Sequence, residues 1–265
     1  MTVLNKLRYL PYQQQKRKEE IQIMKKSFIV LMTGIFCFIL SASMTFGLTP
    51  EESLKSNFPG IPIDNMTPCN VPGLYEVTAG QQIFYYCPEA EAIIGGPIIV
   101  KGGRNLTEEK QEALEKKRLA EMAKKVKDIP LGKALKIGSG KNTVIEITDP
   151  DCHFCRQASQ YFKGRTDATR YVFFVPLQKD SAPKIQHILC AQDKAKAYED
   201  AMEGKLDDMK LAICNDSAVE ELAKTHRETA LNLGLTGTPM FFINGQPVVG
   251  ANIPVIEKLL GDNKQ

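Results

Sequence analysis

The chain has 265 residues, of which 43% are hydrophobic and 25% are charged, and its formal net charge is +3. This length exceeds the roughly 100 to 200 residues of one domain, and the apolar content is enough for packed cores, which excludes a mainly disordered chain. The first 26 residues carry seven Lys/Arg and two Glu, so the remainder has a net charge of −2 (+3 minus +5). The sequence therefore offers no basic surface for nucleic acid.

The N-terminal segment is typical of an export signal. A pair of lysines precedes an apolar run over residues 28–40, and small residues follow it. We predict that residues 1–23 are an upstream extension without a fold and that Met24 is the true start. Residues 24–47 are then a signal peptide, or a membrane anchor if the apolar run continues to the roughly 20 residues that a span needs.

Residues 48–104 contain short strand-like runs broken by Pro and Gly, which predicts a small antiparallel sheet. Residues 73–77 and 82–86 form a predicted hairpin that turns at an Ala-Gly pair. Cys69 and Cys87 flank this hairpin, and the sequence leaves open whether they form a disulfide near its open end or remain two buried free thiols.

Residues 105–132 predict a linker helix. From Thr107 to about Lys127, Glu residues come early and Lys residues late, as the helix dipole favours. The apolar positions form only a thin stripe, which indicates a mostly solvated helix between two domains.

Residues 133–265 predict an α/β domain. A strand begins at Thr143, and the elements after it are a helix, a strand over 171–177, helices through Cys190 and Tyr198, a helix over 217–233, strands over 240–243 and 248–249, and a helix over 253–260. This order is thioredoxin-like with a helical insert.

The sequence Cys152-His153-Phe154-Cys155, between a predicted strand and a predicted helix, is the strongest functional signal. A helix start stabilises negative charge, so a cysteine placed there ionises more readily than an ordinary thiol. Cys152 is therefore the expected nucleophile, and Cys155, one helical turn later, is the expected resolving thiol. Arg156 in the next position excludes a haem attachment sequence. A zinc site is disfavoured because adjacent His and Cys ligands strain a tetrahedral site, and we expect no metal or cofactor.

Other positions in the same region bear on the chemistry. Pro239, after Thr238, precedes a predicted strand, where a proline must take the first position or a cis turn. Glu146 lies in an otherwise apolar strand, so it either faces water or serves as a buried proton acceptor. Cys190 and Cys214 have apolar neighbours, which indicates a structural role.

Several segments resemble the DsbC/DsbG family of thiol:disulfide interchange proteins. Residues 151–155, 189–205 and 234–239 are similar to the family's catalytic domain. Residues 72–77 and 102–107 resemble, less specifically, its small N-terminal dimerisation domain.

This resemblance implies a homodimeric periplasmic protein that acts on disulfide-containing or unfolded client proteins and is kept reduced by a DsbD-like membrane reductase. It implies a cis bond between Thr238 and Pro239, whose backbone receives the substrate peptide. It also implies that Cys190 and Cys214 form a structural disulfide.

The chain departs from the family at three points, one of which is the added pair Cys69 and Cys87. His153 and Phe154 replace the Gly-Tyr common in the isomerases, and these side chains help to set the redox potential. Glu146, six residues before Cys152, matches instead the buried acid of thioredoxins and DsbA-type oxidases. Our hypothesis is an exported disulfide isomerase, and the alternatives are a dithiol oxidase, a client-specific reductase and a chaperone whose cysteines are only structural.

Overall fold

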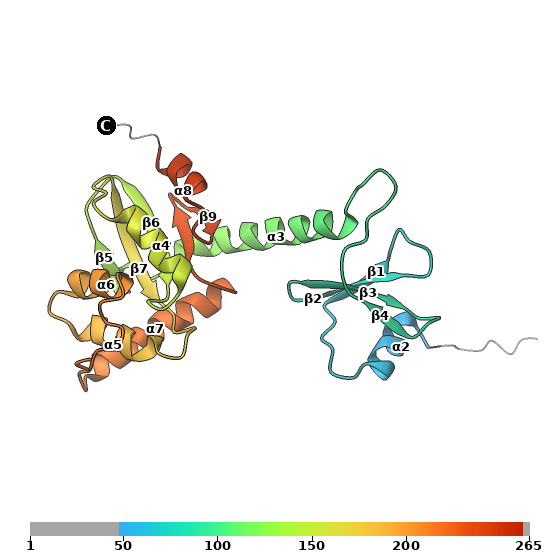
Figure 1. The fold of residues 1–265 in the computed structure, drawn as a ribbon, viewed down its shortest axis with the longest axis horizontal. Helices are drawn as coiled ribbons and strands as arrows, with labels where there is room; N and C mark the ends of the chain where they lie inside the picture. Colours follow the sequence, from blue (N-terminus) through green and yellow to red (C-terminus); the bar gives the residue numbers. More distant parts are fainter. Residues whose placement is uncertain (1–47, 262–265) are drawn as a thin grey trace, which may run out of the picture. The chain divides into compact units, whose positions relative to one another are not determined.

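The computed structural model describes residues 48–261, so the predictions for residues 1–23 and 24–47 lie outside it. The chain divides into two compact units between Gly95 and Gly96 (Figure 1). Among residues 48–261, no helix is long and apolar enough to cross a bilayer.

The first unit is a four-stranded antiparallel sheet with one helix. Its elements are α2 (Pro50–Asn57), β1 (Asn65–Pro68), β2 (Tyr75–Ala79), β3 (Gln82–Cys87) and β4 (Ala92–Ile94), and the strand order is β1-β2-β3-β4. The predicted hairpin is confirmed as β2 and β3. Sequence reasoning missed α2, although Thr49 and Glu52 form a capping box at its start. After the sheet, Ile99 and Asn105 form an isolated antiparallel bridge.

Helix α2 packs on the sheet through a small apolar core. Leu54, Val77 and Tyr86 are fully buried there. The Tyr86 hydroxyl lies 2.7 Å from Ser53 Oγ and accepts a hydrogen bond from Asn57 Nδ2 at 3.2 Å. The buried ring is therefore anchored to the helix at its polar end.

Cys69 and Cys87 are both free thiols, so the candidate disulfide between them is absent. The sheet order explains why. Cys69 N–H bonds to the Leu74 carbonyl beside β2, whereas Cys87 belongs to β3 on the other side of β2. Two strand spacings of about 4.8 Å separate the cysteines, which exceeds the Cα separation of about 4.4–6.8 Å in disulfides.

The second unit begins with α3 (Leu106–Lys125), close to the predicted helix. Asn105 caps it by accepting a hydrogen bond from Glu108 N–H at 3.1 Å. Most of α3 is polar, but Met122 near its end is buried among residues of the C-terminal sheet. Two short 3₁₀ helices, η1 (Val126–Asp128) and η2 (Leu131–Lys133), follow it.

The C-terminal sheet has the order β5-β7-β6-β8-β9, in which only β6 and β7 are parallel. Its strands are β5 (Leu135–Ile137), β6 (Asn142–Thr148), β7 (Ala168–Phe174), β8 (Met240–Ile243) and β9 (Gln246–Val249), and its helices are α4 (His153–Phe162), α5 (Ser181–Cys190), α6 (Lys194–Met202), α7 (Ser217–Leu233) and α8 (Ile253–Leu260). The predicted α/β, thioredoxin-like class is confirmed. The helices predicted over 217–233 and 253–260 have the predicted bounds, whereas β5 was missed and β7 begins three residues earlier than predicted.

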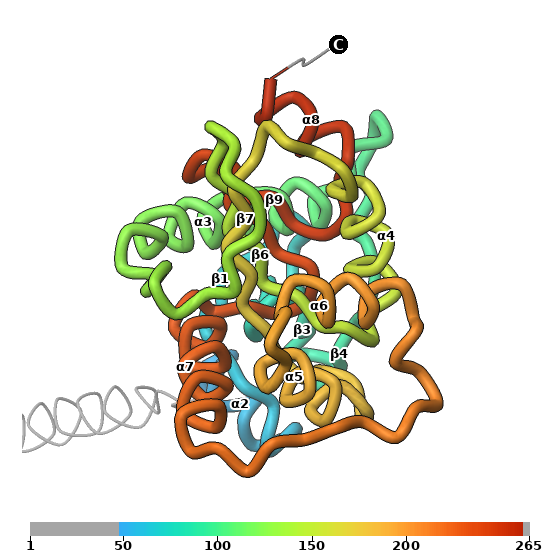
Figure 2. Tube along the Cα trace, turned by 90° about the vertical axis from the view of Figure 1, so that its left-hand side faces the viewer, coloured from blue at the N-terminus to red at the C-terminus, as the bar shows by residue number. Residues whose placement is uncertain are grey.

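The central strand β6 separates two apolar layers. Ile145 and Ile147 pack with Leu233 of α7 on one face, whereas Val144 packs with Ala158 and Phe162 of α4 on the other. Helices α5 and α6 form the insert and lie side by side, with α7 beside α5 (Figure 2). The sheet thus holds the start of α4 at the end of β6.

A buried histidine joins α7 to the sheet. His226 Nδ1 accepts a hydrogen bond from Phe174 N–H at 3.1 Å, and its Nε2 lies 2.8 Å from the Lys133 carbonyl oxygen. This pattern requires the neutral ring with its proton on Nε2. Burial lowers the pKa of His226 below its usual 6.5, and the bond to Lys133 only partly opposes this.

Candidate active site

The cysteine pair lies where β6 passes into α4. Strand β6 ends at Thr148, and Cys152 is the residue that precedes the first helical turn. Cys152 N–H bonds to the Asp149 carbonyl at 3.1 Å, and Cys152 carbonyl accepts from Arg156 N–H at 3.1 Å. Cys152 is partly exposed, whereas Cys155 has no exposed surface. The thiol expected to attack is thus accessible to solvent, and Cys155 is buried.

Thr238 and Pro239 lie beside Cys152, although 86 residues separate Thr238 from it in sequence. Cys152 Sγ donates to the Thr238 carbonyl at 3.3 Å, and the Thr238–Pro239 bond is cis. Strand β8 starts at the next residue and pairs antiparallel with β6, which brings the two segments together. The Pro239 carbonyl accepts from Gly250 N–H at 2.9 Å.

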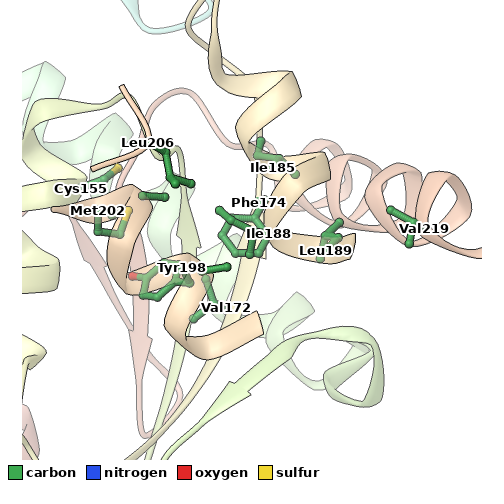
Figure 3. Packing of buried hydrophobic residues seen from close by; sticks show 12 residues of the cluster. Cys155, Val172, Phe174, Ile185, Ile188, Leu189, Tyr198, Met202, Leu206 and Val219 are labelled. Atoms are coloured by element: carbon green, nitrogen blue, oxygen red, sulfur yellow. The ribbon is translucent and has the colours of Figure 1, made fainter. Parts of the chain in front are cut away.

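Cys155 sits at one end of the apolar cluster between α4 and the insert, next to Met202 (Figure 3). Burial raises the pKa of the Cys155 thiol well above its usual range. The Thr148 hydroxyl, the Asp149 backbone and the Thr238 hydroxyl favour its thiolate, although Cys152 opposes it. The Thr148 hydroxyl is fully buried and has no hydrogen-bond partner in the described part of the chain. Burial outweighs the groups that favour the thiolate, so Cys155 is a protonated thiol at neutral pH.

His153 and Phe154 occupy the first turn of α4, and both are exposed. Their rings are in edge contact, with centroids 5.6 Å apart, and 59% of Phe154 is exposed. The two residues that distinguish this motif thus face solvent.

Glu146 does not face water, and its role as a buried proton acceptor stays a prediction. Its side chain is only 1% exposed, and it pairs with Arg170 on the neighbouring strand, with Arg170 Nη2 donating to Oε2 at 2.5 Å. Tyr198 donates to the other oxygen at 2.9 Å. Burial alone would lower the pKa of Arg170, but Glu146 and Tyr198 hold it above its usual value. Glu146 is thus a buried, paired carboxylate, and the arginine within an apolar strand is the sequence signal that could have revealed its partner.

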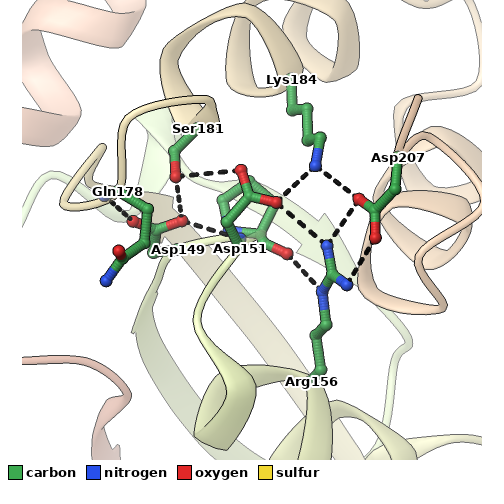
Figure 4. A network of polar contacts seen from close by, with 8 residues as sticks. Asp149, Asp151, Arg156, Gln178, Ser181, Lys184 and Asp207 are labelled. Atoms are coloured by element: carbon green, nitrogen blue, oxygen red, sulfur yellow. Dashed lines mark hydrogen bonds and ion pairs between the residues drawn. The ribbon is translucent and has the colours of Figure 1, made fainter. Parts of the chain in front are cut away.

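Sequence reasoning also missed the carboxylates before Cys152. Asp149 is fully buried and accepts from the backbone N–H groups of Leu177 and Gln178, at 2.7 and 3.0 Å, and from Ser181 Oγ at 2.5 Å. These bonds fix the loop after β6 to the start of the insert (Figure 4). The pattern Asp149-Pro150-Asp151 directly after a buried strand is a signal that could have identified this loop.

A disulfide joins Cys190, at the end of α5, to Cys214, before α7, with their Cα atoms 5.7 Å apart. The loop that it closes contains α6 and the segment that follows α6. Between residues 48 and 261 there is no group of three or more His, Cys, Asp or Glu side chains that could hold a metal ion.

Comparison with known proteins identifies both units. Residues 47–108 match the family described as disulfide bond isomerase protein N-terminal domain, and residues 133–256 match the thioredoxin-like domain family. A probable thiol:disulfide interchange protein DsbC of Bordetella avium is 31% identical over 187 residues, which are 69% of this chain and 62% of that protein. The thiol:disulfide interchange protein DsbC of Escherichia coli K12 is 25% identical over 257 residues, 91% of this chain and 98% of that protein.

Among solved structures, a disulfide interchange protein from Neisseria gonorrhoeae is 34% identical, with a TM-score of 0.42, and the match covers 51% of this chain and 98% of that one. The chain spans about 62% of the length of the Bordetella relative that it matches. The first match covers the N-terminal sheet, and the second covers the domain that holds Cys152 and Cys155. The chain belongs to the DsbC family of thiol:disulfide interchange proteins.

Proposed function

We propose that this protein is an exported disulfide isomerase in which Cys152 is the nucleophile and Cys155 the resolving thiol. The observation that carries the proposal is the pairing of a partly exposed Cys152 at the start of α4 with a buried Cys155 one turn later. The Thr238 carbonyl 3.3 Å from Cys152 Sγ supports a role for Thr238 and Pro239 in receiving the client backbone.

The chemistry balances without a cofactor. The Cys152 thiolate attacks one sulfur of a wrong client disulfide, forms a mixed disulfide and releases the other client sulfur as a thiolate. A second client thiolate can then attack the client sulfur of the mixed disulfide, which forms a new client disulfide and regenerates Cys152. Alternatively, Cys155 attacks Cys152, which releases a reduced client and leaves a Cys152–Cys155 disulfide.

That last outcome oxidises the protein by two electrons, so an external reductant must restore it. We assign this step to a DsbD-like membrane reductase in the periplasm. Residues 48–104 would form a homodimer, which places two redox centres in one molecule. Residues 24–47 would supply export.

Exposed apolar side chains support the binding of unfolded clients beside the redox pair. Phe154 lies between the cysteines, and Val249 pairs with Met240, the residue after Pro239. Leu177 N–H bonds to Asp149, and 50% of Leu177 is exposed. Unfolded proteins display apolar segments that such side chains can contact.

The test is the refolding of scrambled ribonuclease by wild type, Cys152→Ser and Cys155→Ser, with Cys69→Ser/Cys87→Ser as the matched control. We expect no isomerisation by Cys152→Ser, accumulation of mixed disulfides by Cys155→Ser, and wild-type activity in the control. Wild-type refolding by Cys152→Ser would contradict the proposal.

A dithiol oxidase is the second candidate, favoured by the exposed His153 at the helix start, where a charged ring would stabilise the Cys152 thiolate. The equilibrium of the Cys152–Cys155 pair with glutathione separates the two, because about 30 mV shifts this two-electron couple tenfold. An oxidase would remain reduced at glutathione ratios that oxidise an isomerase, and it would oxidise reduced ribonuclease faster than it reshuffles the scrambled form.

A further inference from the structure

Four charged side chains surround the loop that carries Cys152, and we call them the loop-anchoring network: Asp151, Arg156, Lys184 and Asp207 (Figure 4). Arg156 donates to both oxygens of Asp207 at 2.8 Å and to Asp151 at 3.1 Å. Lys184 donates to Asp207 at 2.5 Å and also contacts Asp151. Each cation thus bridges the same two carboxylates.

The network connects the redox loop to the helical insert. Asp151 and Arg156 stand on either side of the cysteine pair, whereas Lys184 lies on α5 and Asp207 follows α6. Gly204, with a φ of +76°, leaves room for the pair: a Cβ there would lie 3.1 Å from Asp207 Oδ2 and 3.3 Å from Arg156 Nη1. The turn after α6 is therefore fitted closely around the Arg156–Asp207 pair.

Arg156 also holds the loop backbone. Its Nε donates to the Pro150 carbonyl at 2.7 Å, two residues before Cys152, while its own backbone N–H bonds to Cys152. A guanidinium can make all these bonds at once because its donors are fixed in a planar fork. Only 26% of the Arg156 side chain and 9% of the Lys184 side chain are exposed, so solvent screens these contacts less than it screens a surface pair.

The network also sets the charge beside the nucleophile. The four side chains of the loop-anchoring network sum to zero, and the carboxylate of Asp149, which shares Ser181 with Asp151, brings the local charge to −1. Loss of Arg156 would leave −2 next to the site where the thiolate forms. Negative charge opposes a thiolate and so favours the disulfide over the reduced pair. The hydrogen bonds from Arg156, together with those from Lys184, hold the pKa of Asp207 below its usual value although burial opposes this, so this carboxylate stays charged at neutral pH.

We propose that Arg156 is a positioning residue for Cys152: through Pro150, Asp151 and Asp207 it fixes the nucleophile loop to the insert and offsets the negative charge beside it. The inference rests on the proposed function, because it concerns the reactivity of the same thiol. It gives the insert a role in the redox centre without any contact between the insert and a client.

The test compares wild type, Arg156→Gln and Arg156→Lys, with Arg165→Gln as the matched control. Arg165 pairs with Asp167 at 2.8 Å just beyond the other end of α4 and is 21% exposed, so it is also a partly buried arginine paired with an aspartate, away from the cysteines. The measurements are the alkylation rate of Cys152 by iodoacetamide against pH, the glutathione equilibrium constant and the urea midpoint.

Arg156→Gln should slow alkylation near pH 7 and shift the glutathione equilibrium toward the disulfide, each by roughly two- to tenfold, the range for one charge acting across partly solvated protein. Arg156→Lys keeps the charge but lacks the planar set of donors, so we expect a smaller change in both the alkylation rate and the glutathione equilibrium. Asp207→Asn added to Arg156→Gln restores the charge to −1 and should recover part of the loss. Arg165→Gln should leave both redox measurements unchanged.

The inference would be overturned if folded Arg156→Gln had the wild-type alkylation rate and the wild-type glutathione equilibrium. If Arg156→Gln does not fold, the same result in Arg156→Lys and in the double variant would overturn it. The proposed function fails separately: if Cys152 of the wild type neither reacts with iodoacetamide nor equilibrates with glutathione, the fault lies there and not with Arg156.

Discussion

The Glu146–Arg170 pair allows a test of whether Glu146 is structural or a proton acceptor. The perturbation is Arg170→Met, which leaves the Glu146 carboxylate buried with only the Tyr198 hydroxyl as its partner. The substitution removes two hydrogen bonds to Glu146, of 3.2 and 2.5 Å. It also removes the guanidinium that lies 4.8 Å from the centre of the Phe162 ring.

The expected cost follows from burial. The side chains of Glu146 and Arg170 are 1% and 9% exposed, and removing one partner of a buried pair costs about 3–5 kcal/mol. Replacing both by methionine removes the uncompensated charge, so Glu146→Met/Arg170→Met should recover most of that loss. Lys124→Met breaks the exposed pair with Glu121, at 70% and 55% exposure, and should cost under about 1 kcal/mol.

The assay is urea unfolding followed by far-ultraviolet circular dichroism, read at the transition of the C-terminal unit. With a slope of roughly 2 kcal/mol per molar urea, Arg170→Met should lower that midpoint by about 1.5–2.5 M. The double variant should also retain thiol exchange. A double variant that folds but no longer exchanges disulfides would refute a purely structural role for Glu146. Its loss of activity would then come from the missing proton acceptor and not from a damaged fold.

Further predictions concern stability and the resolving step. The pKa of His226 in the folded protein lies below 6.5, so the contribution of this residue to stability is present above pH 6.5 and is lost as the pH falls below that value. The urea midpoint should therefore drop toward pH 5, and His226→Gln should make the midpoint depend less on pH. Cys190→Ala/Cys214→Ala opens a loop with a sequence separation of 24 and should cost about 3.5 kcal/mol, and dithiothreitol should destabilise the wild type, but not this variant, by a similar amount. Thr148→Val removes the hydroxyl that favours the Cys155 thiolate, so stopped-flow measurements should show slower release from a mixed disulfide with an unchanged rate of initial attack.

Local patterns predicted most of the C-terminal unit. The helix over 217–233 has an Asp cap and a left-handed Gly234 at its end, and both signals act within a few residues. The short strands β1 and β5 have no comparable signal, because each is defined by its pairing with another strand. Strand β1, four residues long and ending in proline, resembles a turn when read alone.

The sequence predicts those parts of the site whose residues lie close together in the chain. The cysteine motif shows the nucleophile and its helix directly, whereas Arg170 lies 24 residues from Glu146 and Asp207 lies 51 residues from Arg156. Buried charges find their partners through the packing of strands and helices, which periodicity does not specify. The sequence left the pairing of Cys69 and Cys87 open for the same reason, because only the sheet order shows that β2 lies between them.

The central claim is that an exposed Cys152 reacts first and a buried Cys155 reacts second. The most direct measurement is limited alkylation of the fully reduced protein with iodoacetamide, followed by peptide mass mapping of both cysteines at successive times. The account predicts that Cys152 is modified well before Cys155, which should stay largely unreacted until the protein unfolds. Modification of Cys155 first, or of both cysteines at one rate in the folded protein, would contradict it.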